Sequence, residues 1–78
     1  MEDKLKSLMS EMFNLTKDSI GKSTEMSQVL GWDSLRHMEL ITLLEETFKM
    51  TLEIEEILEM KSFSKILEIL KGKLSNDS

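Results

Sequence analysis

Ser34 and His37 are the two residues whose types and spacing come nearest to a catalytic pair, within the stretch GWDSLRHMEL at residues 31–40. Residues three apart share a helix face, so an imidazole there would lie beside the hydroxyl. A serine hydrolase also needs a group that orients the base and a cleft with an oxyanion hole. A chain of 78 residues leaves little room for such a cleft. We therefore expect no catalytic residues, and we expect His37 to lie on the surface with its ring resting on a neighbour.

The chain has even fewer residues suited to a disulfide, a metal site or a phosphate-binding loop. The chain has one histidine and no cysteine, so it forms no disulfide and no thiolate metal site. Its acids have no recognisable metal-ligand spacing, and its three glycines are too far apart to form a phosphate-binding loop. We predict no metal site.

The acidic residues are concentrated in one part of the chain. Residues 33–60 hold eight acids and two bases, whereas the other fifty residues hold seven acids and eight bases. Such a surface repels nucleic acid and attracts basic protein patches, although a charged helix face can also serve solubility alone. The N-terminus has no long apolar run, so it is not a signal peptide, and no run is long enough to span a membrane. We expect a soluble, monomeric, cytoplasmic protein.

Apolar residues recur at helical spacing along most of the chain, and there is no proline. This pattern predicts an all-α fold, a small four-helix bundle with three long helices and one short helix. The helices are expected at residues 2–16, 34–49, 51–60 and 63–74, with Asp33 and Ser62 as N-cap residues. A long loop over residues 18–33, with a short helical turn at 25–29, joins the first two. Residues 1–74 are then a single domain, and residues 75–78 a disordered tail.

The core positions follow from the same periodicity. The second helix should bury Leu40, Ile41, Leu44 and Phe48, with Leu35 and Met38 partly off that stripe. The third helix should turn Ile54, Ile57 and Leu58 inward. The long loop should be pinned by Ile20, Met26, Val29 and Leu30.

Ser34 is also well placed to carry a covalent group. It follows the N-cap residue Asp33, and the free amides and positive dipole end of a first helical turn stabilise a phosphate. On position alone, an ordinary capping or first-turn serine is the better explanation, because serine is very common at helix starts.

Asp33-Ser34-Leu35, opening an amphipathic helix after a long glycine-bearing loop, resembles the acyl carrier protein family. Further matches to the family pattern are Leu30-Gly31, Glu39-Leu40, Leu44-Glu45-Glu46 and Phe48. The order of long helix, long loop, acidic helix, short helix and last helix matches over nearly the whole chain.

The resemblance implies a non-catalytic carrier. A phosphopantetheinyl transferase would move 4′-phosphopantetheine from coenzyme A to Ser34, flanked by Asp33 and Leu35. The arm's thiol would hold acyl groups as thioesters and deliver them to enzymes of fatty-acid, polyketide or another specialised acyl pathway. In the family the acidic second helix docks on basic enzyme patches, which points here to Arg36, Met38, Glu39, Glu45, Glu46, Glu53, Glu55 and Glu56. Leu35 and Met38 are either apolar anchors of that surface or ordinary core. The family's shelter for an acyl chain, between the second and third helices, would be lined by Leu40, Leu44, Ile54, Leu58 and Met60.

Three residues depart from the housekeeping fatty-acid type. They are Trp32, Arg36 and His37, and Arg36 implies a different local docking surface. A WDSL start with a nearby histidine is more similar to stand-alone carriers with a dedicated cargo, such as a hydroxy, amino or polyketide starter acid. Trp32 also fits a loop anchor whose N–H finds a partner. The alternative to a carrier is an unmodified acidic adaptor that binds a basic protein, and replacement of Ser34 distinguishes the two.

Overall fold

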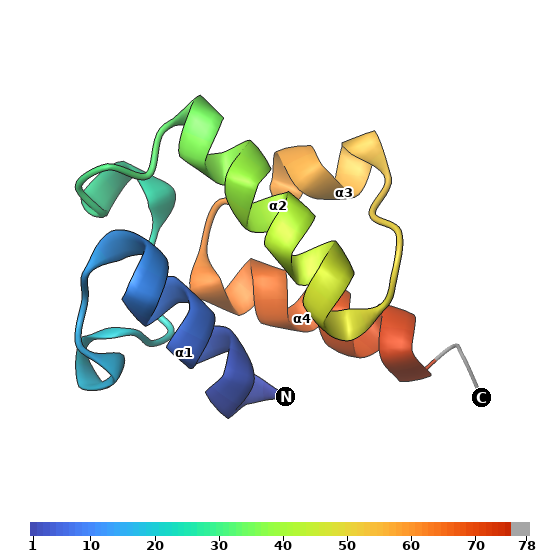
Figure 1. Ribbon diagram of the computed structural model, residues 1–78, viewed down its shortest axis with the longest axis horizontal. Coiled ribbons are helices and arrows are strands. Elements are labelled where there is room, and N and C mark those ends of the chain that lie inside the picture. The colour runs from blue at the N-terminus through green and yellow to red at the C-terminus, as the bar shows by residue number, and fades with distance from the viewer. Residues whose placement is uncertain (76–78) are drawn as a thin grey trace.

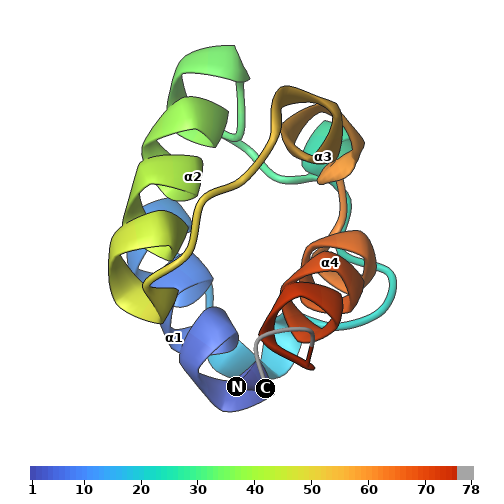
Figure 2. The same ribbon diagram turned by 90° about the vertical axis from the view of Figure 1, so that its right-hand side faces the viewer.

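The computed structural model describes residues 1–75 of the chain, and the predicted all-α fold is confirmed. Four α-helices follow in the order α1 (Glu2–Phe13), α2 (Ser34–Phe48), α3 (Ile54–Glu59) and α4 (Phe63–Ser75). Two single-turn 3₁₀ helices, η1 (Lys17–Ser19) and η2 (Met26–Gln28), lie in the connection between α1 and α2. In the end-on view the four α-helices surround one interior (Figure 2).

The first helix is shorter than its apolar pattern predicts. It ends at Phe13 because Asn14 adopts the left-handed conformation (φ 56°) and donates its backbone N–H to Ser10. Asparagine tolerates this conformation better than most residues and often closes a helix in this way. Glu2 and Asp3 occupy the first turn, where negative charge suits the helix dipole.

The long connection is fastened to the start of α4. The backbone N–H of Met26 donates to the carbonyl of Lys61 at 2.7 Å, and that of Phe63 donates to Thr24 at 2.9 Å. Ile20 is buried, and the predicted turn at 25–29 is confirmed as η2. These bonds hold a segment of the connection beside α3 and α4, which are distant in sequence.

Leu30 was predicted to pin this connection to the core, and that prediction is wrong. Its side chain is 95 % exposed, whereas Trp32 two residues later is buried. Between them Gly31 turns the chain with a φ of +89°, a value that suits glycine. The turn sends Trp32 inward and leaves Leu30 in solvent.

The start of α2 is as expected, because the Asp33 carboxylate accepts the N–H of Arg36 at 2.9 Å. The helix ends at Phe48, where Lys49 takes a left-handed conformation (φ 55°). α3 begins at Ile54, three residues later than predicted, and the segment before it buries Leu52. A side-chain oxygen of Glu56 accepts the N–H of Glu53 at 2.8 Å, which satisfies a backbone donor at the start of α3.

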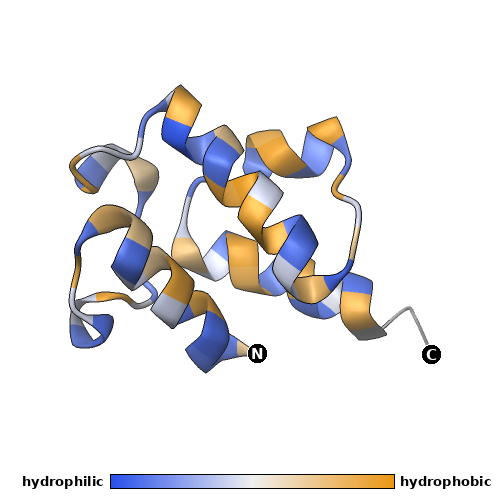
Figure 3. Ribbon diagram, in the orientation of Figure 1, coloured by the Kyte–Doolittle hydropathy of each residue, from blue (hydrophilic) through white to orange (hydrophobic). Residues whose placement is uncertain are grey.

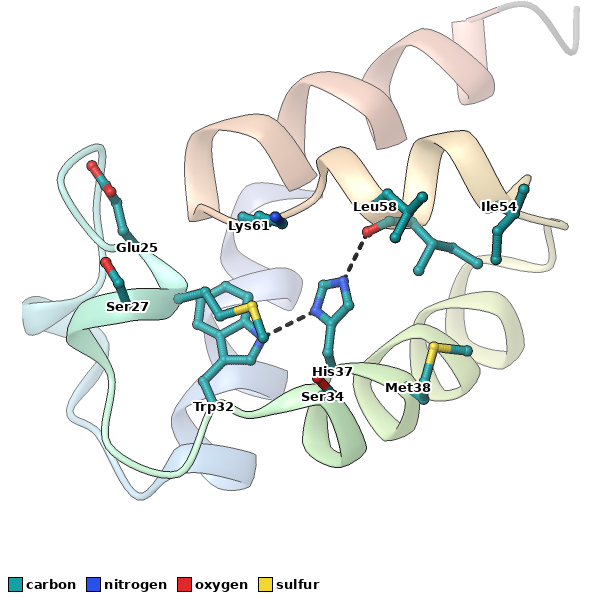
Figure 4. A pocket seen from close by; sticks show the side chains of 11 residues that line it. Glu25, Ser27, Trp32, Ser34, His37, Met38, Ile54, Leu58 and Lys61 are labelled. Atoms are coloured by element: carbon teal, nitrogen blue, oxygen red, sulfur yellow. Dashed lines mark hydrogen bonds between the residues drawn. The ribbon is translucent and has the colours of Figure 1, made fainter.

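The prediction that α3 turns three apolar residues inward is wrong for two of them. Ile57 is buried, but Ile54 and Leu58 are each 62 % exposed. A helix of six residues has fewer than two turns, so only a narrow face meets the interior. The two exposed residues lie on the side turned toward the N-terminal half of α2, where Figure 4 shows them.

The last helix begins as predicted, with the Ser62 hydroxyl accepting the N–H of Lys65 at 3.1 Å. It includes Ser75, which was predicted to begin the tail, and residues 76–78 lie outside the described part of the chain. Apolar and polar segments alternate along each helix (Figure 3), so each places one face toward the interior seen in Figure 1. The largest fully buried side chains are Leu5, Met9, Leu40, Ile41, Leu44, Met60, Ile66 and Leu70. Within residues 1–75, no helix has the length and apolar character that a membrane crossing requires.

Candidate functional site

Ser34 is exposed at the first position of α2, on the edge of a groove of about 670 Å³. The groove lies between the η2 connection, the start of α2 and α3 (Figure 4). Met26, Met38, Ile54 and Leu58 supply apolar lining, whereas Glu25, Ser27 and Lys61 supply polar groups. The volume is within the range of small-molecule sites.

The start of α2 suits a phosphodiester on this hydroxyl. Asp33 caps the helix by accepting the N–H of Arg36. The amides of Ser34 and Leu35 have no partner within the helix, because they lie in its first turn. These amides and the helix dipole favour negative charge beside Ser34. A 4′-phosphopantetheine arm therefore fits here, because the acceptor is exposed and the groove begins next to it.

His37 was predicted to lie on the surface, and this is wrong: only 8 % of it is exposed. The indole Nε1–H of Trp32 donates to His37 Nδ1 at 3.0 Å, and His37 Nε2 lies 2.8 Å from the carbonyl oxygen of Ile57. Since an indole N–H only donates, Nδ1 must accept, and the ring proton belongs on Nε2, which donates to Ile57. Both ring nitrogens are thus engaged, and His37 has none left to serve Ser34 as a base.

Trp32 is the loop anchor that the sequence indicated. Its ring is buried and stacks on Phe13 of α1 with 5.3 Å between ring centroids. The same ring lies 6.0 Å from the His37 ring, so one aromatic stack joins α1, the connection and α2. This stack positions the residues immediately before Ser34.

Apolar side chains are exposed around Ser34. Leu35 is 72 % and Met38 47 % exposed on α2, and Met38 lines the groove together with Ile54 and Leu58 of α3. The alternative that Leu35 and Met38 are ordinary core is therefore wrong. These four residues, Leu35, Met38, Ile54 and Leu58, are here called the apolar rim.

The predicted acids fall into two groups. Glu45 accepts the backbone N–H of Leu52 at 2.9 Å, and Glu56 forms an ion pair with Lys73 at 2.8 Å. That lysine, followed by the backbone N–H of Glu53, lowers the pKa of Glu56 below its ordinary value. Glu45 and Glu56 therefore hold the α2–α3 connection and α3 in place.

The remaining predicted acids are exposed: Glu39, Glu46, Glu53 and Glu55. Glu39 forms one exposed ion pair, 3.7 Å from Arg36. Such a surface pair holds its charges weakly, so the Glu39 carboxylate remains open to an incoming cation. The Glu53 side chain belongs to the capping box at the start of α3.

The structure divides the residues expected to line an acyl shelter. Ile54 and Leu58 line the groove, whereas Leu40, Leu44 and Met60 are fully buried in the core and do not reach it. Sequence reasoning missed Met26, Ser27 and Lys61, which no motif marks. The only sequence signal for the hydrogen bond between Trp32 and His37 was their residue type, because both are aromatic side chains that can form hydrogen bonds. No cluster of metal-ligating side chains occurs among residues 1–75.

The described residues form a helical bundle that presents the exposed Ser34 at the start of α2, beside the groove. The family model described as "Phosphopantetheine attachment site" matches residues 3–70. The chain therefore belongs to this family, the predicted acyl carrier relationship is confirmed, and 4′-phosphopantetheine is its cofactor.

Among curated proteins the chain is similar to two non-reducing polyketide synthases named pks11, from Talaromyces marneffei and from its strain ATCC 18224 / CBS 334.59 / QM 7333. Each is 32 % identical over 72 residues, which cover 92 % of this chain and 3 % of the relative. The chain thus spans a very small part of these relatives.

Proposed function

We propose that Ser34 is the attachment point and that the chain shuttles acyl thioesters between enzymes. The observation that carries this proposal is the exposed Ser34 hydroxyl at the α2 N-terminus, beside the groove, inside the segment that matches the family. Attachment joins Ser34 Oγ to the β-phosphorus of coenzyme A, releases adenosine 3′,5′-bisphosphate and frees the hydroxyl proton. The arm supplies the thiol that this cysteine-free chain lacks.

In this proposal the residues of the chain bind and orient, and chemistry belongs to the partner enzymes. Asp33 caps α2 and holds the first turn, so that the amides of Ser34 and Leu35 face the phosphodiester. Trp32 anchors the connection before the serine. Both ring nitrogens of His37 are hydrogen-bonded within the fold, so neither is free to act as a base on the thioester.

The proposed docking surface for the transferase and for acyl-processing enzymes with basic patches consists of the apolar rim and the exposed acids of α2 and of the start of α3. Leu35, Met38, Ile54 and Leu58 offer apolar contact, and Glu39, Glu46, Glu53 and Glu55 offer charge. Electrostatic steering speeds encounter, and a small contact area allows quick release, as a shuttle requires. Arg36, exposed beside Ser34, contributes a local positive charge that an incoming partner must accommodate.

The pathway we propose is polyketide-type or another specialised acyl pathway. Similarity to two polyketide synthases supports it. A fatty-acid pathway is the less favoured choice, because the buried His37 side chain reaches from α2 to the Ile57 carbonyl of α3 and occupies the space between these helices.

Intact-protein mass after incubation with coenzyme A and a promiscuous phosphopantetheinyl transferase tests the attachment. We expect one phosphopantetheinyl group on the wild type and none on Ser34→Ala. Ser27→Ala is the matched control, because Ser27 is another exposed serine of the same groove, and it should be modified normally. An unmodified wild type beside a modified control carrier would refute the proposal and favour the unmodified adaptor. Modification of Ser34→Ala would place the attachment elsewhere.

A further inference from the structure

A hydrogen-bonded chain of three groups crosses from the connection to α3 beneath the groove. The Trp32 indole donates to His37 at 3.0 Å, and His37 donates to the Ile57 carbonyl at 2.8 Å (Figure 4). The His37 side chain starts from α2 and ends on the backbone of α3. It therefore ties together the two helices that would have to separate before anything from the groove reached the interior.

The interior below this chain is already filled. Leu40, Leu44 and Met60 show no exposed surface, and none of them lines the groove. Protein interiors pack at the density of organic crystals, so an inserted chain needs space that these side chains would have to vacate. Trp32 and His37 themselves are 4 % and 8 % exposed, which makes them the boundary between groove and core.

Entry to the core would also leave polar groups without partners. Separating α2 from α3 at this point breaks the bond to Ile57, and displacing the indole breaks the bond to His37. Buried donors and acceptors that lose their partners are costly. An apolar cargo therefore gains less free energy from entering this core than it would gain if only apolar side chains lay between α2 and α3.

We propose that Trp32 and His37 hold the floor of the groove closed, so that a thioester cargo lies along the open groove and does not enter the core. This inference rests on the proposed attachment at Ser34. It makes His37 a positioning residue that sets cargo depth, and it assigns the site to short acyl groups. A long saturated chain would remain largely in water, where nothing shelters it.

The groove also suits polar substituents on such a cargo. The Ser27 hydroxyl and the Lys61 side chain lie among its lining groups, and its outer side is open to solvent. A hydroxyl or keto group placed there keeps its hydrogen bonds, whereas burial without a partner would cost free energy. Short hydroxyacyl and ketoacyl groups are therefore the cargo class that the geometry favours.

The test compares two cargoes on the full chain, loaded from acetyl-coenzyme A and decanoyl-coenzyme A by a promiscuous transferase. Mass spectrometry first confirms one acyl-phosphopantetheine per chain, and a failure at this step would count against the attachment at Ser34 and not against the closed floor. Hydroxylamine then cleaves the thioester, and the rate reports how accessible it is. Backbone amide chemical shifts of Leu40, Leu44 and Met60 report whether the core is entered.

For the wild type we expect similar cleavage rates for both cargoes, within about twofold, because neither populates a sheltered state. The three core amides should not move between the acetyl and decanoyl forms. Protection of the decanoyl thioester by about tenfold, with shifted core amides, would overturn the inference, since it would mean a state with about a tenth of the thioester exposed.

Variants then test whether the hydrogen-bonded floor is the cause. His37→Ala removes the ring, and Trp32→Phe removes only the indole N–H. Each should make the decanoyl thioester slower to cleave while leaving the acetyl rate unchanged. Leu70→Ala is the control, because Leu70 is buried in the core and does not line the groove, so the substitution opens core space while keeping the floor intact, and it should give no protection.

His37→Gln provides the conservative rescue. The glutamine amide can donate to the Ile57 carbonyl. The decanoyl thioester on this variant should therefore be cleaved at a rate closer to wild type than the thioester on His37→Ala. If His37→Ala does not fold, Trp32→Phe and the wild-type comparison still decide the matter. Equal protection of the decanoyl thioester in Leu70→Ala and Trp32→Phe would mean that a general loosening of the fold, and not an opened floor, admits the acyl group. This result would also overturn the inference.

Discussion

The most direct prediction concerns the stability of His37→Leu. Leucine keeps an apolar side chain at this position but removes both hydrogen bonds of the ring. The indole N–H of Trp32 then has no partner in a site that is 4 % exposed, at a cost of about 1–3 kcal/mol. The Ile57 carbonyl keeps a weaker bond from the N–H of Met60, 3.3 Å away, so its loss is nearer about 1 kcal/mol.

Together these losses predict that His37→Leu lowers the free energy of unfolding by about 2–4 kcal/mol. A chain of 78 residues has a total stability of about 4–12 kcal/mol, so the loss is a large fraction of the whole. The melting temperature should fall by roughly 10–25 °C for a domain of this size.

Urea unfolding followed by circular dichroism measures this difference, with Trp32→Phe and the double variant completing a mutant cycle. Trp32→Phe removes the same indole–imidazole bond from the other side. The double variant should therefore be more stable than the sum of the two losses predicts, by about 0.5–1.5 kcal/mol. A loss below about 1 kcal/mol in His37→Leu, or additivity within about 0.3 kcal/mol, would show that this hydrogen bond does not hold the fold as we argue.

The remaining predictions concern three other parts of the chain. Leu58→Ala should change stability by no more than about 0.5 kcal/mol, because the side chain is 62 % exposed, yet it should lower the transferase kcat/KM in a coenzyme A loading assay. Glu56→Gln should destabilise the protein at neutral pH, since Lys73 lowers the pKa of Glu56 in the fold. That difference should be complete above about pH 4.3, the unfolded value, and should vanish as the pH falls through the lowered folded pKa; an unchanged difference in urea titrations at acid pH would contradict it. Gly31→Ala should cost about 1–2 kcal/mol in urea unfolding, because φ is +89° there, and a neutral result would mean that the turn adapts.

Local features of the chain were predictable because their causes are local. Asp33 and Ser62 cap the helices that follow them, as side chains of their type do wherever helix amides are free. The position of Ser34 at a helix start follows from the same signals. Helix ends were less predictable, because Asn14 and Lys49 stop α1 and α2 through backbone conformations that the apolar pattern does not report.

The sequence by itself determined the helical class, the placement of Ser34 and the concentration of acids between residues 33 and 60. Periodicity, capping and charge depend on near neighbours, so they can be read along the chain. Only the tertiary structure decided that His37 is buried and that Leu30 and Leu58 are exposed. The partner of His37 is a backbone carbonyl twenty residues away, and it is brought there only when α2 packs against α3. No pattern in the chain encodes such a contact, and it is the contact that closes the floor of the groove beside Ser34.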